Sequence, residues 1–445
     1  MSFLPSVLQL FKAKADNFCA GQIAKCFSAW QSITSDSEVL QTVSGEHIDF
    51  SSHPTTSCAT GANVVKPGDN KIFLLEISKL LKKGVILPSA HEDVEFISPI
   101  FLRAKKDGTH RLILNLKDFN KHVTYYHFKM DTIWTGINLM TTHCYMASVD
   151  LKDAYYSVPI APSDQKFLKF EWSQQLYQYT CFPNGLAFCP RKFTKLLKPA
   201  YASLRQKGHI SSAYIDDSWL SGNDYDSCVK NVIDTITLFD KLGFVIHPEK
   251  SVLNPTQVIG FLGFTLDSIT MRVYLTSEKA EKLKLEASAL FHCHRPSIRM
   301  VARVIGILIS SFPGNQFGPL HYRFLEMSKT SALQCHHGNF DAHMTLSQEA
   351  KSELTWWISS IGNAFNYIGR GNAQFIIISD ASKKGWGGVA GDRRTQGLWT
   401  EHEAAQHINF LEMLAVFFNL KSFENMITEK HVKVLVDNVA KLQGL

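Results

Sequence analysis

Three aspartates at two places in the chain could together hold metal ions. Asp150 follows the stretch 145–149, and Asp216 and Asp217 come directly after Tyr214-Ile215. Carboxylate oxygens that converge on one point are the ligands that Mg²⁺ prefers. Two such ions about 3.5–4 Å apart can activate an attacking hydroxyl and hold a leaving pyrophosphate. The three carboxylates therefore indicate a site for nucleotidyl transfer assisted by two metal ions.

Two short strands must bring these carboxylates together. Residues 145–149 alternate in polarity and predict a strand that ends at Asp150. Adjacent side chains in a strand point to opposite faces, so Asp216 and Asp217 can serve one site best at the tight turn of a hairpin within residues 210–221. An isolated Asp-Asp pair is more often a surface turn. Further motifs along the chain favour the metal site over that alternative.

The stretch 148–159 reads Ser-Val-Asp-Leu-Lys-Asp-Ala-Tyr-Tyr-Ser-Val-Pro and closely resembles the first catalytic motif of retroviral and retrotransposon reverse transcriptases. The resemblance implies metal ligation by Asp150 and by the backbone of Leu151. It also implies that Asp153 and Ala154 line a triphosphate pocket through their backbone, and that Tyr155 is a steric gate. A flat ring beneath the sugar would clash with a 2′-hydroxyl and so select deoxynucleotides. A packed core tyrosine is the alternative for Tyr155.

Three later stretches resemble further motifs of the same family, in the family's order. Residues 182–190 look like its Leu-Pro-x-Gly motif, with Phe in place of Leu and Asn184 where many relatives carry Gln or Phe. Residues 242–250 end in a lysine that the family places near the triphosphate, and residues 259–264 resemble the hairpin that grips the primer end. An ordinary Pro-Asn-Gly turn is the alternative for the first of them. The residues implied are Asn184, Gly185 and Lys250 for the nucleotide and Phe261, Leu262 and Gly263 for the primer grip.

Basic residues gather in a predicted hairpin over residues 98–115. Between Arg103 and Lys121 there are six Lys or Arg against two Asp. Such a bias suits contact with phosphate groups, and the resemblance places Lys105, Lys106 and Arg111 over the triphosphate. A solvated hairpin tip is the alternative for any single lysine.

Two predicted helix faces are also basic. No carboxylate occurs between Glu171 and Asp216, and Arg191, Lys195 and Lys198 follow helical spacing, which predicts a stripe that faces phosphates. Apolar residues in 280–290 and 298–309 predict a pair of helices, the second of which carries three arginines at a spacing of four. The three arginines are Arg295, Arg299 and Arg303. A helix pair with such a basic face suits a thumb that holds a nucleic-acid backbone. A plain solvated face is the alternative for this helix and for the stripe over 191–198.

A second set of carboxylates lies near the end of the sequence. A buried strand over 375–379 leads to Asp380, Glu412 lies in an apolar helix over 408–420, and a strand over 432–436 leads to Asp437. This order resembles the ribonuclease H fold, whose site also binds two magnesium ions. An exposed Glu412 is the alternative, because a charge inside so apolar a helix is costly. Few residues follow Asp437, so we expect an incomplete unit with little RNA cleavage.

Composition agrees with these expectations without deciding between them. The formal charge is +6, the pI is about 8.7 and 45% of the 445 residues are hydrophobic. A chain of this length and hydrophobic content can form two or three domains. Its mild positive charge is consistent with binding to nucleic acid. Nine cysteines without a Cys-x-x-Cys pair indicate a reducing interior, so we expect an intracellular protein of cytoplasm or nucleus, not of a membrane. The His-Cys clusters 292–294 and 335–337 lack zinc-finger spacing and are not favoured as zinc sites.

The expected fold class is α+β, a right-hand polymerase of fingers, palm and thumb followed by a partial ribonuclease H-like α/β domain. The expected domains are an N-terminal helical extension and linker over 1–70, fingers and palm over 71–268, thumb and connection over 269–345, and connection with a truncated ribonuclease H-like domain over 346–445. The phrases within residues 380–388 and 407–412 are most similar to the DIRS class of retrotransposons.

The resemblance implies an RNA-directed DNA polymerase. Its partners would be an RNA template, a DNA primer and deoxynucleoside triphosphates, and its cofactor would be two Mg²⁺ ions, with Mn²⁺ as an alternative. A catalytically inactive or domesticated nucleic-acid-binding remnant is the second hypothesis. A polymerase that makes RNA from RNA is the third, and both Tyr155 and the ribonuclease H-like segment oppose it. The sequence does not indicate an oligomeric state.

Overall fold

The computed structural model describes residues 13–54, 68–105, 108–369 and 371–436. The chain divides into two compact units, the first formed by Met1–Leu262 with Leu266–Thr270 and the second by Gly263–Thr265 with Met271–Leu445. The division runs through a hairpin of two strands, β10 (Val258–Phe261) and β11 (Phe264–Asp267). No helix in the described part of the chain is both long and apolar enough to cross a membrane.

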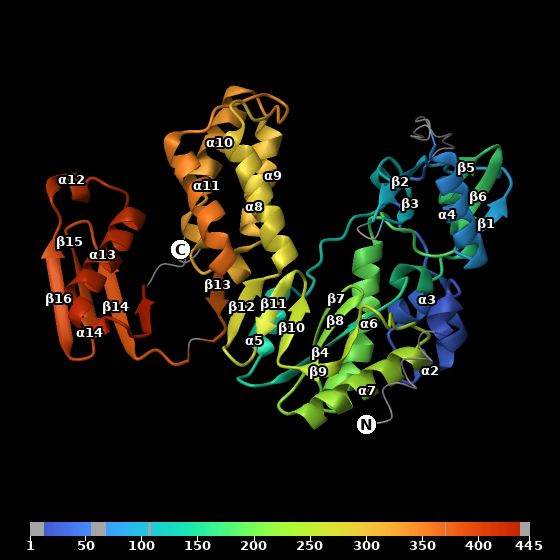
Figure 1. The fold of residues 1–445 in the computed structure, drawn as a ribbon, viewed down its shortest axis with the longest axis horizontal. Coiled ribbons are helices and arrows are strands. Elements are labelled where there is room, and N and C mark those ends of the chain that lie inside the picture. The colour runs from blue at the N-terminus through green and yellow to red at the C-terminus, as the bar shows by residue number, and fades with distance from the viewer. Residues whose placement is uncertain (1–12, 55–67, 106–107, 370, 437–445) are drawn as a thin grey trace. The chain divides into compact units, whose positions relative to one another are not determined.

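The centre of the first unit is an antiparallel sheet of four strands in the order β7-β8-β4-β9. Two helices that touch each other, α6 and α7, cover one face of this sheet (Figure 1). Five of the six residues of β8 are buried, which is consistent with the apolar Trp-Leu pair in its middle. The bounds are β4 (Tyr145–Asp150), β7 (Ile210–Tyr214), β8 (Asp217–Gly222), β9 (Val252–Thr256), α6 (Cys189–Gln206) and α7 (Tyr225–Lys241).

Smaller sheets form the part of this unit that was predicted as fingers. Strands β2 and β3 make the predicted hairpin, and β1, β6 and β5 make a three-stranded sheet. Helix α4 packs against β1 and β3. The bounds are α4 (Asn70–Lys82), β1 (Ile86–Ser89), β2 (Ile100–Ala104), β3 (His110–Leu114), η2 (Phe119–Lys121), α5 (Ile133–Leu139), η3 (Ala154–Ser157), η4 (Pro162–Phe167), β5 (Lys169–Trp172) and β6 (Gln175–Tyr179).

A buried lysine joins β5 to the loop after β1. Lys169 has no exposed surface, and its Nζ donates hydrogen bonds to the Ala90 carbonyl at 2.7 Å and to Glu92 and Glu95 at 2.8 Å each. Burial alone would raise the pKa of Glu95, but hydrogen bonds from Lys169 and His91 lower it. The loop is therefore held by a compensated buried charge rather than by apolar packing alone.

The N-terminal segment is built into the core of the first unit. Its elements are η1 (Gln22–Cys26), α2 (Phe27–Gln31) and α3 (Ser37–Gly45). Trp30 has no exposed surface, and its Nε1 donates to the Leu242 carbonyl at 3.0 Å. Gly243 lies at φ +89°, and a Cβ there would stand 3.0 Å from the Cα of Ile23. The described part of the predicted extension therefore shares one core with the palm.

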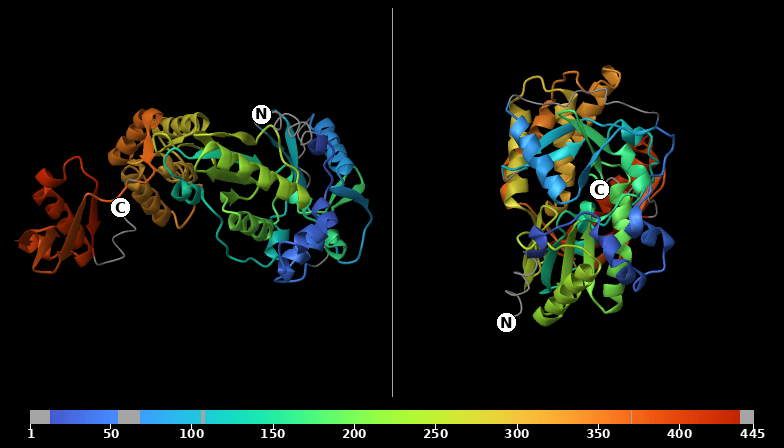
Figure 2. Two further views of the ribbon diagram at one scale, coloured as in Figure 1. Left: turned by 90° about the horizontal axis from the view of Figure 1, so that it is seen from below. Right: turned by 90° about the vertical axis from the view of Figure 1, so that its right-hand side faces the viewer.

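Four helices in the second unit pack as a bundle (Figures 1 and 2). Helix α8 contacts α9 and α11, and α10 contacts the same two helices. Ser297 caps α9 by accepting a hydrogen bond from the Met300 amide at 3.2 Å, and the buried side chains of α9 follow helical spacing, as predicted. The bounds are β12 (Arg272–Leu275), α8 (Ser277–His292), α9 (Ile298–Ile309), η5 (Phe312–Gly314), η6 (Gly318–Leu320), α10 (Arg323–Cys335), α11 (Gln348–Ser360), η7 (Ile361–Asn363) and β13 (Phe365–Tyr367).

A four-stranded sheet in the order β16-β15-β14-β17 completes the second unit, with β17 parallel to β14 and the other pairs antiparallel. Helix α13 packs on β14 and β15. Its buried Asn419 donates to Ser379 Oγ at 2.9 Å and to the Gly387 carbonyl at 3.0 Å, and a Cβ at Gly388 would collide with it. The bounds are β14 (Phe375–Ala381), β15 (Gly385–Ala390), β16 (Arg393–Leu398), α12 (Glu401–Ala404), α13 (Ile408–Ser422), α14 (Glu424–Ile427) and β17 (Val432–Leu435).

Candidate active site

Strand pairing brings two of the predicted aspartates together. Asp150, the last residue of β4, is the register partner of Asp217, the first residue of β8. Asp217 also pairs with Tyr214, which leaves Ile215 and Asp216 as the two-residue turn between β7 and β8. The predicted carboxylate hairpin is thus confirmed. Ile215 lies at φ +55°, a conformation that β-branched residues rarely adopt, so the turn is strained.

The carboxylates of this hairpin repel one another. Burial raises the pKa of Asp150 to about 7; Lys250 opposes this rise, and Asp216 and Asp217 add to it. Burial and Asp216 also raise the pKa of Asp217, whose side chain is hydrogen-bonded to that of Asp150. Lys250 Nζ lies 3.8 Å from an Asp150 oxygen. A cluster of this kind is stabilised by a proton or by a bound cation.

The donor chemistry of the cluster fits a divalent cation, since carboxylate oxygens in a buried, negatively charged setting are its preferred ligands. Asp150 and Asp217 already lie side by side, and Asp216 is close enough to act on the pKa of both. Within the described ranges, however, no group of three or more His, Cys, Asp or Glu side chains is arranged ready to hold a metal ion. The His-Cys clusters 292–294 and 335–337 are among the described residues that this statement covers.

The backbone of Asp150 is held by hydrogen bonds to residues that follow α7. Its carbonyl accepts from the His247 amide at 2.8 Å, and its amide donates to Ser251 Oγ at 3.0 Å. The Leu151 amide donates to the Asp216 carbonyl at 3.0 Å, which ties the predicted metal ligand to the hairpin turn. Sequence reasoning missed Ser251, whose only signal is its place in the stretch after Lys250.

Tyr155, the predicted gate, is partly buried on η3. Its ring meets the Phe193 ring of α6 edge to face, with centroids 5.4 Å apart. Burial raises the pKa of its phenol well above the usual range, so the side chain stays neutral. Asp153, two residues before Tyr155, lies at φ +50°, and its carboxylate pairs with Lys83 Nζ at 2.6 Å. Its side chain is thus occupied, which leaves only its backbone for the predicted pocket.

Asn184 and Arg111 converge on one tyrosine. Asn184 Nδ2 donates to the Tyr156 hydroxyl at 3.1 Å. Burial raises the pKa of Tyr156, and both Arg111 and Asn184 act against that rise. Gly185 lies at φ +101°, where a side chain would be strained, and its carbonyl accepts from Asn120 Nδ2 at 2.9 Å. A glycine is therefore favoured there by the turn itself, which was the alternative given for this motif.

The remaining predicted residues lie in turns and at the ends of strands. Lys105 follows β2, and its amide donates to the Thr109 carbonyl at 2.7 Å, whereas Lys106 lies outside the described residues. Leu262 at φ +49° and Gly263 at φ +80° form the two-residue turn between β10 and β11 that the primer-grip resemblance predicted. Phe261 is buried at the end of β10. The binding roles of these residues stay predictions.

Residues 104–266 match the family model described as "Reverse transcriptase (RNA-dependent DNA polymerase)". Residues 104–266 form a reverse transcriptase domain. The match spans all three aspartates of the hairpin site together with Tyr155 and Lys250.

Two curated relatives are polyproteins of mobile or viral elements. The "Enzymatic polyprotein" of figwort mosaic virus (strain DxS) is 23% identical over 399 residues, which cover 84% of this chain and 55% of that protein. The "Transposon Tf2-3 polyprotein" of Schizosaccharomyces pombe is 24% identical over 198 residues, which cover 44% of this chain and 14% of that protein. The chain thus spans about half of the first relative and a small part of the second. The reverse transcriptase domain is of the kind that such retroelement polyproteins carry.

Solved structures support the polymerase fold. A foamy viral protease-reverse transcriptase (dRH) in complex with ds DNA aligns with 94% of this chain and 76% of its own, at a TM-score of 0.61 and 17% identity. The foamy viral protease-reverse transcriptase in complex with RNA/DNA hybrid covers 89% of this chain and 52% of its own, at a TM-score of 0.59 and 17% identity. At this identity the likeness establishes the fold alone. The predicted α+β class and right-hand polymerase fold are confirmed.

Part of the basic stripe on α6, which was predicted to face phosphates, is paired with carboxylates of the N-terminal segment. Arg191 Nη1 lies 3.5 Å from Glu38 of α3, and Lys195 is hydrogen-bonded to the same carboxylate. Lys192 pairs with Glu38 at 3.2 Å and with buried Glu46 at 2.8 Å. Arg191 and Lys195 are thus paired with a carboxylate of the distant N-terminal segment, and their contact with phosphate stays a prediction. Lys198 is exposed.

The arginines predicted for the thumb are also partly engaged. Arg299 pairs with Asp341 at 2.7 Å and Arg303 with Glu286 at 2.6 Å. Both arginines remain largely exposed, so neither pair prevents contact with a nucleic-acid backbone.

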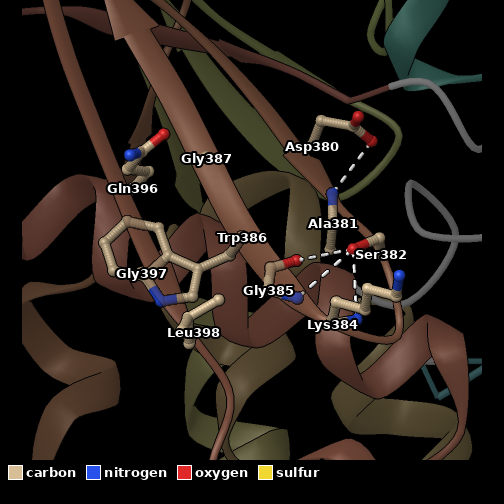
Figure 3. A pocket seen from close by; sticks show the side chains of 10 residues that line it. All are labelled: Asp380, Ala381, Ser382, Lys384, Gly385, Trp386, Gly387, Gln396, Gly397 and Leu398. Atoms are coloured by element: carbon tan, nitrogen blue, oxygen red, sulfur yellow. Dashed lines mark hydrogen bonds between the residues drawn. The ribbon is translucent and has the colours of Figure 1, made fainter.

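The second carboxylate set lies in the unit that follows the reverse transcriptase domain. Asp380 is exposed near the end of β14, beside an open pocket of about 520 Å³ that Trp386 and Gln396 also line (Figure 3). The Ala381 amide donates to Asp380 Oδ1 at 2.9 Å. Glu412 is buried on α13, contrary to the exposed alternative, and Asp437 lies outside the described residues. The structure thus describes two of the three predicted members.

Proposed function

We propose that this chain is an RNA-directed DNA polymerase of a retroelement polyprotein, in which a primer 3′-hydroxyl attacks the α-phosphate of a deoxynucleoside triphosphate. The observation that carries the proposal is the pairing of Asp150 with Asp217 at the ends of β4 and β8, inside a domain that matches the reverse transcriptase family. The raised pKa values of both carboxylates support a site that functions with a bound cation.

The carboxylates Asp150, Asp216 and Asp217, with the backbone of Leu151, would hold two Mg²⁺ ions or, as an alternative, Mn²⁺. Bound ions would supply charge neutralisation and lower the pKa of the primer hydroxyl. The protein's own part is positioning: the backbone bonds around Asp150 fix one carboxylate, and the hairpin turn fixes the other two.

The nucleotide would lie between the hairpin and the predicted fingers. Lys105, Lys106 and Arg111 would neutralise the triphosphate, with Lys250 on the side of Asp150, where its ammonium already lies near the carboxylate. Tyr155 would lie beneath the sugar, braced by the Phe193 ring. The Asn184 and Gly185 turn would contact the incoming base pair, and Phe261, Leu262 and Gly263 would contact the primer end.

An RNA template and a DNA primer are the proposed partners. The foamy viral proteins in these solved structures are in complex with ds DNA and with RNA/DNA hybrid. The formal charge of +6 of this chain is compatible with similar ligands.

Two finer assignments belong to the same proposal. The C-terminal sheet would be a ribonuclease H-like unit with Asp380, Glu412 and Asp437, supported by its strand order, its single parallel pair and the buried Glu412 on α13. The phrases within residues 380–388 and 407–412 support the DIRS class of retrotransposons. An intracellular location would follow from such an element, and the reduced cysteines are compatible with it.

The test is extension of a labelled DNA primer on an RNA template with Mg²⁺ and deoxynucleotides. We expect templated extension that a chelator abolishes and that added Mg²⁺ restores. A chain that binds the template-primer but never extends it would instead support the inactive remnant. Preferential extension with ribonucleotides would support an RNA-making polymerase.

Replacing Tyr155 by Ala is expected to weaken the exclusion of ribonucleotides. Removing the ring opens space for a 2′-hydroxyl, so the relative efficiency of ribonucleotide incorporation should rise by about 10- to 200-fold. The measurement is kcat/KM for matched ribo- and deoxynucleotides. Tyr155→Phe keeps the ring and serves as the matched control, and an unchanged ratio in Tyr155→Ala would mean that this tyrosine is a core residue.

A further inference from the structure

The loop that joins the predicted metal ligand to the predicted gate is held at both ends by the N-terminal segment. Lys152 Nζ donates to the Ala15 carbonyl at 2.8 Å. At the other end of the loop, the Gly21 amide donates to the Tyr156 carbonyl at 2.8 Å. Both contacts join residues far apart in the sequence, and both lie within the first unit.

A third contact reaches the same loop through one intermediate residue. The Ala20 amide donates to the Lys83 carbonyl at 2.8 Å, and Lys83 Nζ pairs with the Asp153 carboxylate. The Lys83 ammonium also lies 5.8 Å from the centre of the Phe18 ring. The middle of the loop is therefore tied to the N-terminal segment as well as its ends.

The N-terminal segment is itself firmly anchored. Gln22 Nε2 donates to the Gly243 carbonyl, and Trp30 Nε1 donates to the Leu242 carbonyl. The Lys152 amide in turn donates to the Val245 carbonyl at 2.8 Å. Lys152 thus receives support from the segment directly, through Ala15, and indirectly, through residues 242–245. Ala15, Trp30, Leu242 and Val245 all belong to one close-packed core, so the groups that contact Lys152 have fixed positions.

We propose that Lys152 is a positioning residue of the polymerase site, which uses the Ala15 carbonyl to hold the loop between Asp150 and Tyr155 in its working geometry. The proposal rests on the proposed function. The N-terminal segment, which lies outside the family match at 104–266, then forms a structural part of the active site. Lys152 itself touches no reacting group; its ammonium acts through the loop.

The chemistry of the contact explains why a lysine serves here. An ammonium donates a charge-assisted hydrogen bond to a carbonyl oxygen, which is stronger than a bond between neutral groups. Methionine has nearly the same length and shape without the donor, so Lys152→Met removes this bond and keeps the packing of the side-chain stem. Misplacement of a loop by about 1 Å can lower a rate about a hundredfold.

The experiment compares Lys152→Met with Lys25→Met, which removes the same charge from an exposed residue of the same segment. We expect Lys152→Met to lower kcat for deoxynucleotide addition by about 10- to 100-fold, with little change in template-primer affinity. Lys25→Met should retain the kcat of the unaltered chain. A lysine that touched phosphate directly would instead change the salt dependence of template-primer binding, by about one unit of slope.

Hydrogen exchange supplies a readout that needs no activity. In Lys152→Met the amides of residues 151–156 should exchange faster than in the unaltered chain, while those of β8 stay protected. A kcat within twofold of the unaltered chain together with unchanged exchange would overturn the proposal. If even the unaltered chain fails to extend a primer, the proposed function fails, and the exchange measurement still decides the positioning role.

A second variant covers the case in which Lys152→Met does not fold. Trp30→Phe keeps one aromatic ring in the core, removes the hydrogen bond to the Leu242 carbonyl and makes the buried side chain smaller. It should speed exchange of the Lys152 amide and lower kcat by less than Lys152→Met, because the Ala15 contact remains. Equal exchange in Trp30→Phe and the unaltered chain would contradict the indirect route.

Discussion

The Asp150→Asn variant is expected to lose primer extension by more than about a thousandfold. Asn keeps the shape of the side chain and the backbone bonds to His247 and Ser251. It removes one anionic ligand from the pair that β4 and β8 bring together. Extension rates under saturating template-primer and nucleotide measure the loss. Asp226→Asn, at an exposed position in the first turn of α7, is the matched control and should extend normally.

The same replacement is expected to stabilise the metal-free protein above pH 7. The folded pKa of Asp150 is raised from 3.8 to about 7, so the folded state holds this proton more tightly than the unfolded state. Stability is therefore lost as the pH rises from about 4 to about 7, and it stays lost above that range. Asn carries no such proton. The measurement is the Tm of chelator-treated protein at pH 5 and at pH 8. The difference between the two Tm values should be smaller in the variant than in the unaltered chain, and an equal difference would contradict the raised pKa.

The Lys169→Met variant is expected to destabilise the first unit by about 3–5 kcal/mol. Lys169 has no exposed surface, and Glu95 beside it is also buried. Removing the ammonium leaves the Glu95 carboxylate in a poorly solvated place without its main partner. The change is measured as the free energy of unfolding in a denaturant titration. A spectroscopic probe in the first unit should report the unfolding.

Lys121→Met is the control for that loss. Lys121 forms an ion pair with Asp118 in which both side chains are well exposed, so water replaces the contact and no measurable change is expected. The Lys169→Met, Glu95→Gln double variant should recover part of the loss, because it leaves no buried charge behind. A loss in Lys169→Met as small as that in Lys121→Met would show that the buried pair adds nothing to stability.

Local pattern was enough to predict the carboxylate hairpin. The alternating strand before Asp150 and the adjacent Asp216 and Asp217 allow few arrangements that serve one site, and the observed pairing of β4 with β8 is one of them. The thumb helix over Ile298–Ile309 was predictable for the same reason, since its buried residues follow a single helical stripe.

Contacts between distant parts of the sequence were not predictable. Glu38 lies 153 positions before Arg191, and no local signal indicates that the two meet. A stripe of cations without nearby carboxylates was therefore interpreted as facing phosphate, although the neutralising group comes from the N-terminal segment. Lys83, the partner of Asp153, was missed for the same reason. The φ of +101° at Gly185 fits the Pro-Asn-Gly turn that the sequence offered as the alternative, and its contact with the nucleotide stays a prediction.

The place of the N-terminal segment in the core has a practical consequence for making shorter versions of the protein. A recombinant fragment that began at residue 104, where the family match starts, would lack Trp30, Val43 and Phe73, all of which have no exposed surface. Residues of the fragment that pack against them, such as Phe244 and Trp172, would be left as an open apolar surface, and such surfaces promote aggregation. Fragments intended for crystallisation or assay should therefore retain residues 13–103, even though this stretch carries no catalytic motif.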